Sequence, residues 1–193
     1  MTIESLIVAI LAITGTAAPH TSKNARVHAE SAQAVATVDF PVEVLLGTAY
    51  VESRFYQTAL SRLEDCTDPK DPKTCIRKTG VWASHVPPPT ARPDWYCGPL
   101  QTGGWVTWAE CQRMRTDVLY GYQQGVRELT KWWNDPSCSR LPDDDRLRCT
   151  LAGHNAGYAG AANYKVSPYV RDVFKARDRI VKITEHEELK PGS

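Results

Sequence analysis

The amino-acid sequence, 193 residues long, predicts an all-α, mainly helical protein. Apolar residues recur at helical spacing in several stretches, whereas no strand-like alternation continues beyond a few positions. We therefore expect roughly two or three strands at most. A chain of this length can bury a sizeable core as one domain. We place that domain at residues 25–185, an apolar helix or signal-like segment at 1–24, and a flexible tail at 186–193.

The N-terminal stretch has features of both a helix and a signal peptide. Residues 6–13 are an unbroken apolar run followed by small residues at 16–18, which is half of a signal peptide. No Lys or Arg precedes the run, however, and Glu4 lies beside it. Thr2 can cap a helix that Gly15 ends. We favour a structural first helix over a cleaved signal, and the run is too short to span a bilayer.

Two helices are predicted in the next part of the chain. The first covers residues 27–38 and has few apolar anchors. Asp39 can cap the second, in whose first turn Pro41 costs no hydrogen bond. One stripe of this second helix carries four residues at i, i+3, i+7 and i+10, namely Val42, Leu45, Ala49 and Glu52.

Glu52 therefore points in the same direction as core-facing residues. A carboxylate on an apolar stripe either finds a partner or stays protonated, because desolvation disfavours the charged form. A protonated carboxyl group is what a general acid needs near neutral pH. The alternative is an amphipathic helix whose last turn directs Glu52 into solvent.

Three helices are predicted in the second half. Residues 115–133 repeat apolar side chains at helical spacing: Val118, Tyr122, Val126, Leu129 and Trp133. Residues 145–156 form another helix, which carries Asn155 at its end. Ser167 and Pro168 begin the last one, and its inner face holds Val170, Val173, Phe174, Ile180 and Val181. We expect fraying from Glu185 onward.

Six cysteines occur as near neighbours in the sequence. Fifteen pairings are possible for six cysteines, but this spacing favours three local disulfides: Cys66–Cys75, Cys97–Cys111 and Cys138–Cys149. They would restrain long loops that include residues 56–96 and 134–144. Disulfides indicate an oxidising compartment, and the alternative is six reduced cysteines in the cytoplasm. No Cys-x-x-Cys or suitably spaced histidine set predicts zinc, and we expect no metal or cofactor.

Charge and aromatic content narrow the class of partner. The 23 Lys and Arg residues are scattered among 22 acids, so no footprint for nucleic acid is predicted. Aromatic residues crowd the sequence around Gly98, namely Trp82, Trp95, Tyr96, Trp105 and Trp108. Flat aromatic faces stack on sugars, which favours a glycan groove there, although core packing is the default for any single one.

Four short motifs follow one another in order: Tyr50-Val51-Glu52-Ser53-Arg54-Phe55, Gly98-Pro99-Leu100-Gln101, Gly153-His154-Asn155-Ala156-Gly157 and Tyr169-Val170. Together they resemble the motifs of soluble lytic transglycosylases, the goose-lysozyme-like peptidoglycan-cleaving family, over roughly residues 25–185. That pattern reads Glu-Ser, Gly-Leu-Met-Gln, Ala-Tyr-Asn-Ala-Gly and a Tyr that opens a late helix. The chain departs from it at Pro99, Leu100 and His154, which stand where Leu, Met and Tyr are usual.

The resemblance implies a lysozyme-like fold and cleavage of the MurNAc-GlcNAc β-1,4 bond of peptidoglycan. Glu52 would act first as acid and then as base toward the C6 hydroxyl, leaving 1,6-anhydroMurNAc ends. No second carboxylate lies inside a matching motif, and Glu64, Asp65 and Asp94 are runners-up that we interpret as solvated surface charges. The alternatives are a goose-type muramidase that uses water, and a non-catalytic glycan-binding or virion structural module.

The resemblance also implies a set of substrate-binding positions: Ser53, Gly98, Gln101, His154, Asn155, Gly157 and Tyr169. Gly98 would let the backbone approach a sugar, Gln101 and Asn155 could hydrogen-bond an acetamido group, and Tyr169 could bond Glu52. For His154 we favour packing in place of tyrosine; the alternative is an imidazole whose charge couples to Glu52. The expected partner is a glycan strand bound by a monomer without a membrane span. We expect an extracytoplasmic location, either periplasmic or secreted, or association with a phage particle or lysis pathway.

Overall fold

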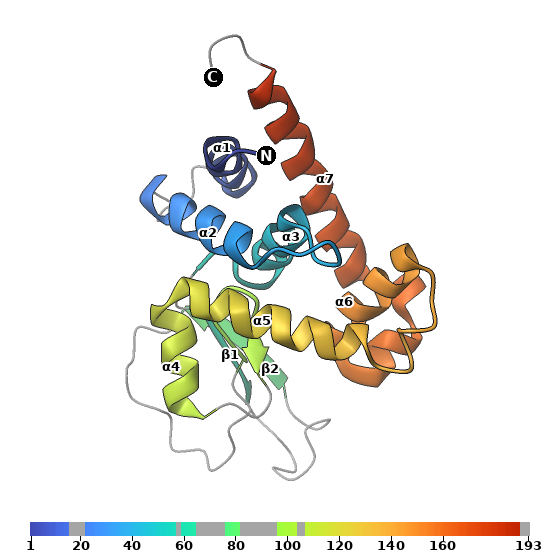
Figure 1. Ribbon diagram of the computed structural model, residues 1–193. Helices are drawn as coiled ribbons and strands as arrows, with labels where there is room; N and C mark the ends of the chain where they lie inside the picture. The colour runs from blue at the N-terminus through green and yellow to red at the C-terminus, as the bar shows by residue number, and fades with distance from the viewer. Residues whose placement is uncertain (16–21, 57–58, 65–75, 82–95, 104–106, 190–193) are drawn as a thin grey trace.

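The computed structural model describes residues 1–15, 22–56, 59–64, 76–81, 96–103 and 107–189. This part of the chain is mostly helical, as the sequence predicts (Figure 1). Its helices are α1 (Ile3–Thr14), α2 (Ser22–Val35), α3 (Val42–Ser53), α4 (Trp108–Thr116), α5 (Val118–Trp133), α6 (Asp143–Ala162) and α7 (Pro168–Glu188), with a 3-10 turn at Tyr164–Val166.

A small antiparallel sheet lies beside the helices. Its strands are β1 (Ala59–Glu64), β2 (Ile76–Val81), β3 (Tyr96–Cys97) and β4 (Thr102–Gly103), in the order β2-β1-β3-β4. Four strands in the described residues exceed the two or three expected. The excess arises because β3 and β4 have two residues each, and such short strands leave no alternation in the sequence.

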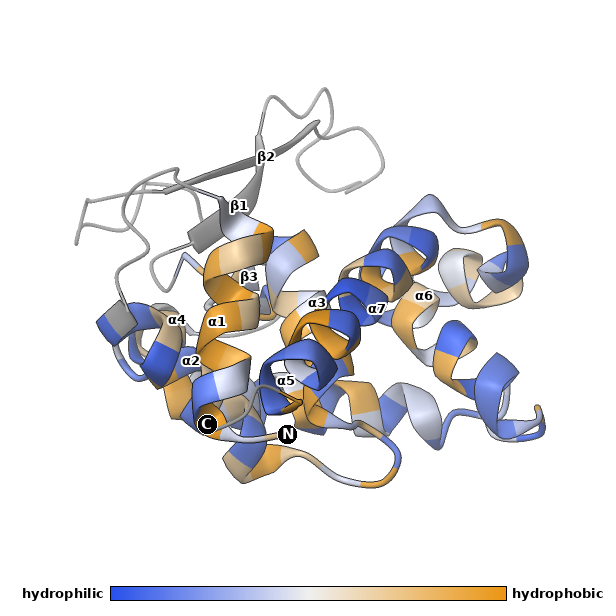
Figure 2. Ribbon diagram, turned by 90° about the horizontal axis from the view of Figure 1, so that it is seen from above, coloured by the Kyte–Doolittle hydropathy of each residue, from blue (hydrophilic) through white to orange (hydrophobic). Residues whose placement is uncertain are grey.

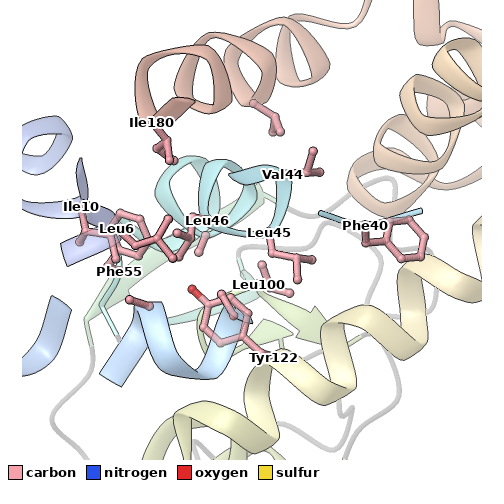
Figure 3. Packing of buried hydrophobic residues seen from close by; sticks show 14 of the residues in the cluster. Leu6, Ile10, Phe40, Val44, Leu45, Leu46, Phe55, Leu100, Tyr122 and Ile180 are labelled. Carbon is pink, nitrogen blue, oxygen red and sulfur yellow. The ribbon is translucent and has the colours of Figure 1, made fainter. Parts of the chain in front are cut away.

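Helix α3 is buried on opposite faces (Figure 3). Leu45 faces Leu100 and Tyr122, while Ile180 of α7 lies on the other side of the helix. All four of these side chains are fully buried, and burying one such apolar side chain contributes about 1.5–3 kcal/mol. The packing therefore fixes the direction in which the last turn of α3, with Glu52, points.

Helix α1 forms as predicted and belongs to the core. The Thr2 hydroxyl accepts a hydrogen bond from the Ser5 amide, and Gly15 ends the helix with φ +71°. Leu6 and Ile10 are fully buried. In Figure 2, α1 is predominantly apolar, whereas α7 alternates between polar and apolar residues. None of the helices in the described ranges is both long and apolar enough to cross a bilayer.

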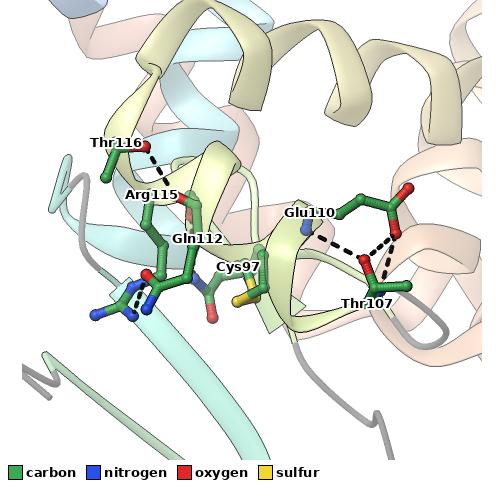
Figure 4. The surroundings of a disulfide bond; sticks show 9 residues. Cys97, Thr107, Glu110, Gln112, Arg115 and Thr116 are labelled. Atoms are coloured by element: carbon green, nitrogen blue, oxygen red, sulfur yellow. Dashed lines mark hydrogen bonds between the residues drawn. A yellow bond between two sulfur atoms is a disulfide. The ribbon is translucent and has the colours of Figure 1, made fainter. Parts of the chain in front are cut away.

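Four helix starts differ from the sequence expectation, and the smallest difference is that of α6, which begins at Asp143 instead of Asp145. Helix α2 occupies residues 22–35 instead of 27–38. Asp39 does not cap α3, because Pro41 takes the cap position and no side chain bonds there. The helix expected at 115–133 starts only after Asp117, whose side chain accepts a hydrogen bond from the Tyr120 amide and caps α5. Before it, Thr107 and Glu110 form a capping box that starts the separate helix α4 (Figure 4).

The last helix begins as predicted and runs further than predicted. Ser167 caps α7 by accepting from the Val170 amide, and Pro168 is its first residue. We expected fraying from Glu185 onward, but α7 continues to Glu188, so this expectation is wrong for residues 185–188. The Glu188 carboxylate accepts from the Thr2 amide at 2.7 Å and from the Ser5 hydroxyl at 3.1 Å. These contacts hold the end of α7 against α1.

Two of the three predicted disulfides are present. Cys97–Cys111 joins β3 to α4 (Figure 4). Cys138–Cys149 joins the α5–α6 connection to α6. Cys66 and Cys75 lie outside the described residues. Both observed bridges link cysteines that are close in sequence, as the short spacing predicts.

Candidate active site

Glu52 lies in the last turn of α3, and its side chain is 15% exposed. Its Oε1 atom lies 3.6 Å from Nε2 of His154, which comes from α6. The sequence indicated that a carboxylate on this stripe needs a partner. His154 is one such partner.

His154 is almost completely buried, with 2% of its side chain exposed. Its Nε2 lies 3.0 Å from the Leu100 carbonyl oxygen, and its Nδ1 lies 3.6 Å from Oε1 of Glu128 on α5. His154 is therefore more than a packing substitute for tyrosine, because each ring nitrogen faces a carboxylate.

The charge of His154 follows from these neighbours. Burial alone would lower the pKa of the imidazole, because it penalises the charged form. The carboxylates of Glu128 and Glu52 and the Leu100 carbonyl outweigh burial and raise the pKa of His154 to about 9. The ring is therefore an imidazolium at neutral pH.

This raised pKa predicts a stability that depends on pH. The pKa of His154 is higher in the folded state than the ordinary value of about 6.5, so the stabilisation is complete below about pH 6.5 and is lost as the pH rises through about 9. In urea unfolding, the free energy of unfolding of wild type should exceed that of His154→Gln, and this difference should shrink by up to about 3 kcal/mol across this window. His186→Gln, at an exposed position of α7, is the control. A constant difference between wild type and His154→Gln would contradict the prediction.

Tyr169, in the first turn of α7, lies near Glu52 as the sequence suggested. Its hydroxyl is buried and meets no acceptor at full hydrogen-bond geometry among the described residues. Burial raises its pKa well above the ordinary value, and the charge and nearby oxygen of Glu52 add to this. Tyr169 therefore presents a neutral phenol to the carboxylate, although the hydrogen bond between them is incomplete.

The segment Gly98-Pro99-Leu100-Gln101 packs on helices more tightly than expected. A Cβ atom on Gly98 would lie 2.9 Å from the Met114 carbonyl, so the absence of a side chain at this position allows close packing on α4. Gln101 adopts φ +46°, and its Nε2 donates to the Gly98 carbonyl at 3.0 Å. Only the buried Oε1 of Gln101, which has no hydrogen-bond partner in the described residues, remains for another donor.

Three other predicted positions have different surroundings. The buried hydroxyl of Ser53 donates to the Ala49 carbonyl at 2.9 Å, so its hydrogen is used within α3. Asn155 is half-buried, and its side chain makes no hydrogen bond to the described residues. Gly157 has φ +62° and ψ −152°, which side chains rarely allow, and together with the non-helical Ala156 it breaks α6 just after Asn155.

The chain just beyond the end of α3 is strained. Arg54 and Phe55 have φ +53° and +60°, and both are non-glycine residues. The Arg54 guanidinium lies 4.1 Å from the centre of the Tyr50 ring, and the Phe55 ring packs edge-on against His28 at 5.3 Å. Such conformations cost about 1–3 kcal/mol each and persist where the surroundings enforce them, often at functional sites.

Unsatisfied polar atoms gather at the same place. Within the described residues, six buried side-chain nitrogen or oxygen atoms lack a hydrogen-bond partner, and five belong to this region: Gln101 Oε1, Thr102 Oγ1, Glu128 Oε2, His154 Nδ1 and Tyr169 OH. Buried polar groups are usually paired, because an unpaired one costs about 1–3 kcal/mol. Their concentration here is typical of a functional site.

A cleft of about 450 Å³ opens beside Glu128. Arg127 and Lys131 line it, and the rings of Trp132 and Tyr158 pack edge-on there with centres 5.2 Å apart. Glu52 does not line this cleft and lies across His154 from Glu128. The sequence prediction had not singled out Trp132 or Tyr158.

Most of the aromatic residues predicted for a glycan groove lie outside the described residues. Trp82, Trp95 and Trp105 lie outside the described residues, as do Asp65 and Asp94. Tyr96 is half-buried in β3, and Trp108 begins α4. Glu64 ends β1.

Glu128 is the functional candidate that the sequence prediction missed. It lies outside the four motifs, and the sequence prediction for α5 used only the apolar stripe, which lies on another face of the helix. A usable signal was present, since Gly121, Gly125 and Glu128 fall at i, i+4 and i+7 on one helix face. Gly125 admits Leu100, because a Cβ atom there would lie 2.1 Å from Leu100 Cδ1.

The arrangement can hold and transfer protons. It combines a partly exposed carboxyl group, an imidazolium, a neutral phenol and a second carboxylate on the wall of a cleft. Within the described ranges, no set of three or more His, Cys, Asp or Glu side chains is arranged to hold a metal ion. Comparison with protein-family models, with curated proteins and with solved structures finds no match for the chain.

Proposed function

We propose that this protein is a peptidoglycan lytic transglycosylase that cleaves the MurNAc-GlcNAc β-1,4 bond. The observation that carries the proposal is the meeting of separate motifs at Glu52. His154 contacts Glu52 and also the Leu100 carbonyl, and Tyr169 lies beside the same carboxylate. Segments far apart in sequence thus surround the one glutamate that the sequence singled out as an acid.

In the proposed reaction Glu52 acts twice. As acid, it gives its proton to the bridging oxygen while the bond to the sugar's C1 breaks and positive charge develops. The acetamido group of the substrate supports this charge. Glu52, now a carboxylate, takes the proton of the C6 hydroxyl as that oxygen bonds to C1. This closes the 1,6-anhydro ring and restores the acid without water.

Hydrolysis is a second candidate, and Glu128 favours it. Inverting glycosidases use one carboxyl group as acid and another as base for water. A second carboxylate near Glu52 satisfies part of that requirement. The non-catalytic glycan-binding or virion module is a third candidate, which the strained backbone and the unpaired polar atoms around Glu52 disfavour.

The disulfides are compatible with an extracytoplasmic protein. We propose that the enzyme acts on glycan strands in the periplasm or outside the cell, or is released with a phage particle or during lysis. Its substrate is then the cell wall of a bacterium.

Mass spectrometry of muropeptides after digestion of purified peptidoglycan tests the proposal. We expect products that end in 1,6-anhydroMurNAc, because the C6 hydroxyl and not water attacks C1. Reducing MurNAc ends would contradict the transglycosylase and support a muramidase. The absence of new products, with retained binding to sedimented peptidoglycan, would support the non-catalytic module.

A further inference from the structure

Glu128 connects the cleft to His154. Its side chain is 20% exposed and lines the cleft, while its Oε1 lies 3.6 Å from His154 Nδ1. Its Oε2 and the His154 Nδ1 have no other hydrogen-bond partner among the described residues. This ion pair therefore joins the wall of the cleft to the imidazole ring.

The number of protons between these groups follows from the Leu100 contact. A carbonyl oxygen only accepts, so the 3.0 Å contact places a hydrogen on His154 Nε2. If neither Nδ1 nor Glu128 carried a hydrogen, two lone-pair acceptors would face each other in a buried site. One proton therefore lies between Glu128 and Nδ1. With that proton on nitrogen, the ring is a cation and Glu128 is its counter-ion.

The cation faces Glu52 from the other side of the ring. The ionisable groups around it are Glu52 from α3, Glu128 from α5 and Tyr169 from α7, which lies near both carboxylates. Arg127 and Lys131 line the cleft beside Glu128. A positive charge at this distance favours the carboxylate form of Glu52, because opposite charges attract strongly where water is excluded.

We propose that Glu128 is a positioning residue that keeps His154 charged and thereby sets the pH range in which Glu52 can act as an acid. The inference rests on the proposed function of Glu52. Without Glu128, only Glu52 and the Leu100 carbonyl offset burial, so the imidazole loses its proton at a lower pH and Glu52 then keeps its proton to higher pH. The charge of Glu128 has the opposite direct effect on Glu52, but it is weaker because Glu128 lies on the far side of the ring.

The rate of peptidoglycan cleavage as a function of pH tests this coupling. In Glu128→Gln the alkaline limb of the pH–rate profile should move to higher pH by about one pH unit relative to wild type. Glu128→Asp, which keeps the charge, should retain the wild-type limb. Glu30→Gln, which removes an exposed carboxylate from α2, should also leave the limb in place. A slower Glu128→Gln enzyme with an unmoved limb would overturn the proposal.

A second measurement does not require catalysis. Titration of the histidine ring signals by NMR, with His154→Gln to identify the signal, should find the wild-type pKa raised to about 9. In Glu128→Gln the pKa of His154 should fall toward the ordinary value of about 6.5, because the largest of the groups that offset burial is removed and only Glu52 and the Leu100 carbonyl remain. An unchanged titration would overturn the coupling. Failure of the wild type to cleave peptidoglycan would instead contradict the proposed function, and the NMR result would still decide whether Glu128 controls His154.

Discussion

Replacement of Glu52 by Gln should lower peptidoglycan clearing by about two or more orders of magnitude. Glutamine keeps the size of the side chain but cannot give up or take the proton that the reaction needs. The fold should persist, because the buried part of α3 that holds residue 52 is unchanged. The measurements are initial rates of turbidity loss and the thermal unfolding midpoint of the same preparations.

Glu43→Gln is the matched control, because it makes the same change in the first turn of the same helix. Its clearing rate should equal that of wild type. Retained activity in Glu52→Gln would show that another group is the acid. Glu128 would then be tested first, since it is a carboxylate that lines the cleft.

Gly125→Leu should destabilise the protein by about 3 kcal/mol and remove most of its activity. Even a Cβ atom at this position would lie 2.8 Å from Leu100 Cβ, so the segment at residues 98–101 must move away from α5. The Leu100 carbonyl that holds His154 would move with it. Urea unfolding gives the loss of stability, and clearing below the unfolding transition gives the loss of activity.

Gln123→Leu controls for the new side chain, because residue 123 is exposed on the same helix. It should change stability by less than about 0.5 kcal/mol. If Gly125→Leu were as stable and active as Gln123→Leu, the close packing of Leu100 on α5 would not be needed to place His154.

The sequence predicted the elements whose signals are local. The stripe of α3 located Glu52, Thr2 and Ser167 located two helix starts, and short spacing located two disulfides. Each of these signals depends on residues within a few turns of one another. Asp39 failed as a cap because a favourable residue type does not ensure that the backbone places it correctly.

The rest of the site depends on contacts between distant segments. Glu128 reaches His154 only because α5 and α6 pack together, and a periodic pattern within one helix cannot show that. Substrate binding by Ser53 and Gly98 stays a prediction, and the structure adds that Ser53 bonds within its own helix and that Gly98 packs on α4. A motif indicates which residues gather at a site, but it does not distinguish those that face a ligand from those that support the backbone.

The contact between α1 and the end of α7 determines where a surface anchor or a fusion partner can be attached. The Thr2 amide and the Glu188 carboxylate touch, so both ends of the described chain lie together, away from α4 and the sheet (Figure 1). The cleft lies beside α4 and α5, on the other side of the molecule. A surface anchor or fusion partner at either end would leave the cleft open to a large insoluble polymer. A short linker could also join the ends and allow the chain to be opened elsewhere as a circular permutant.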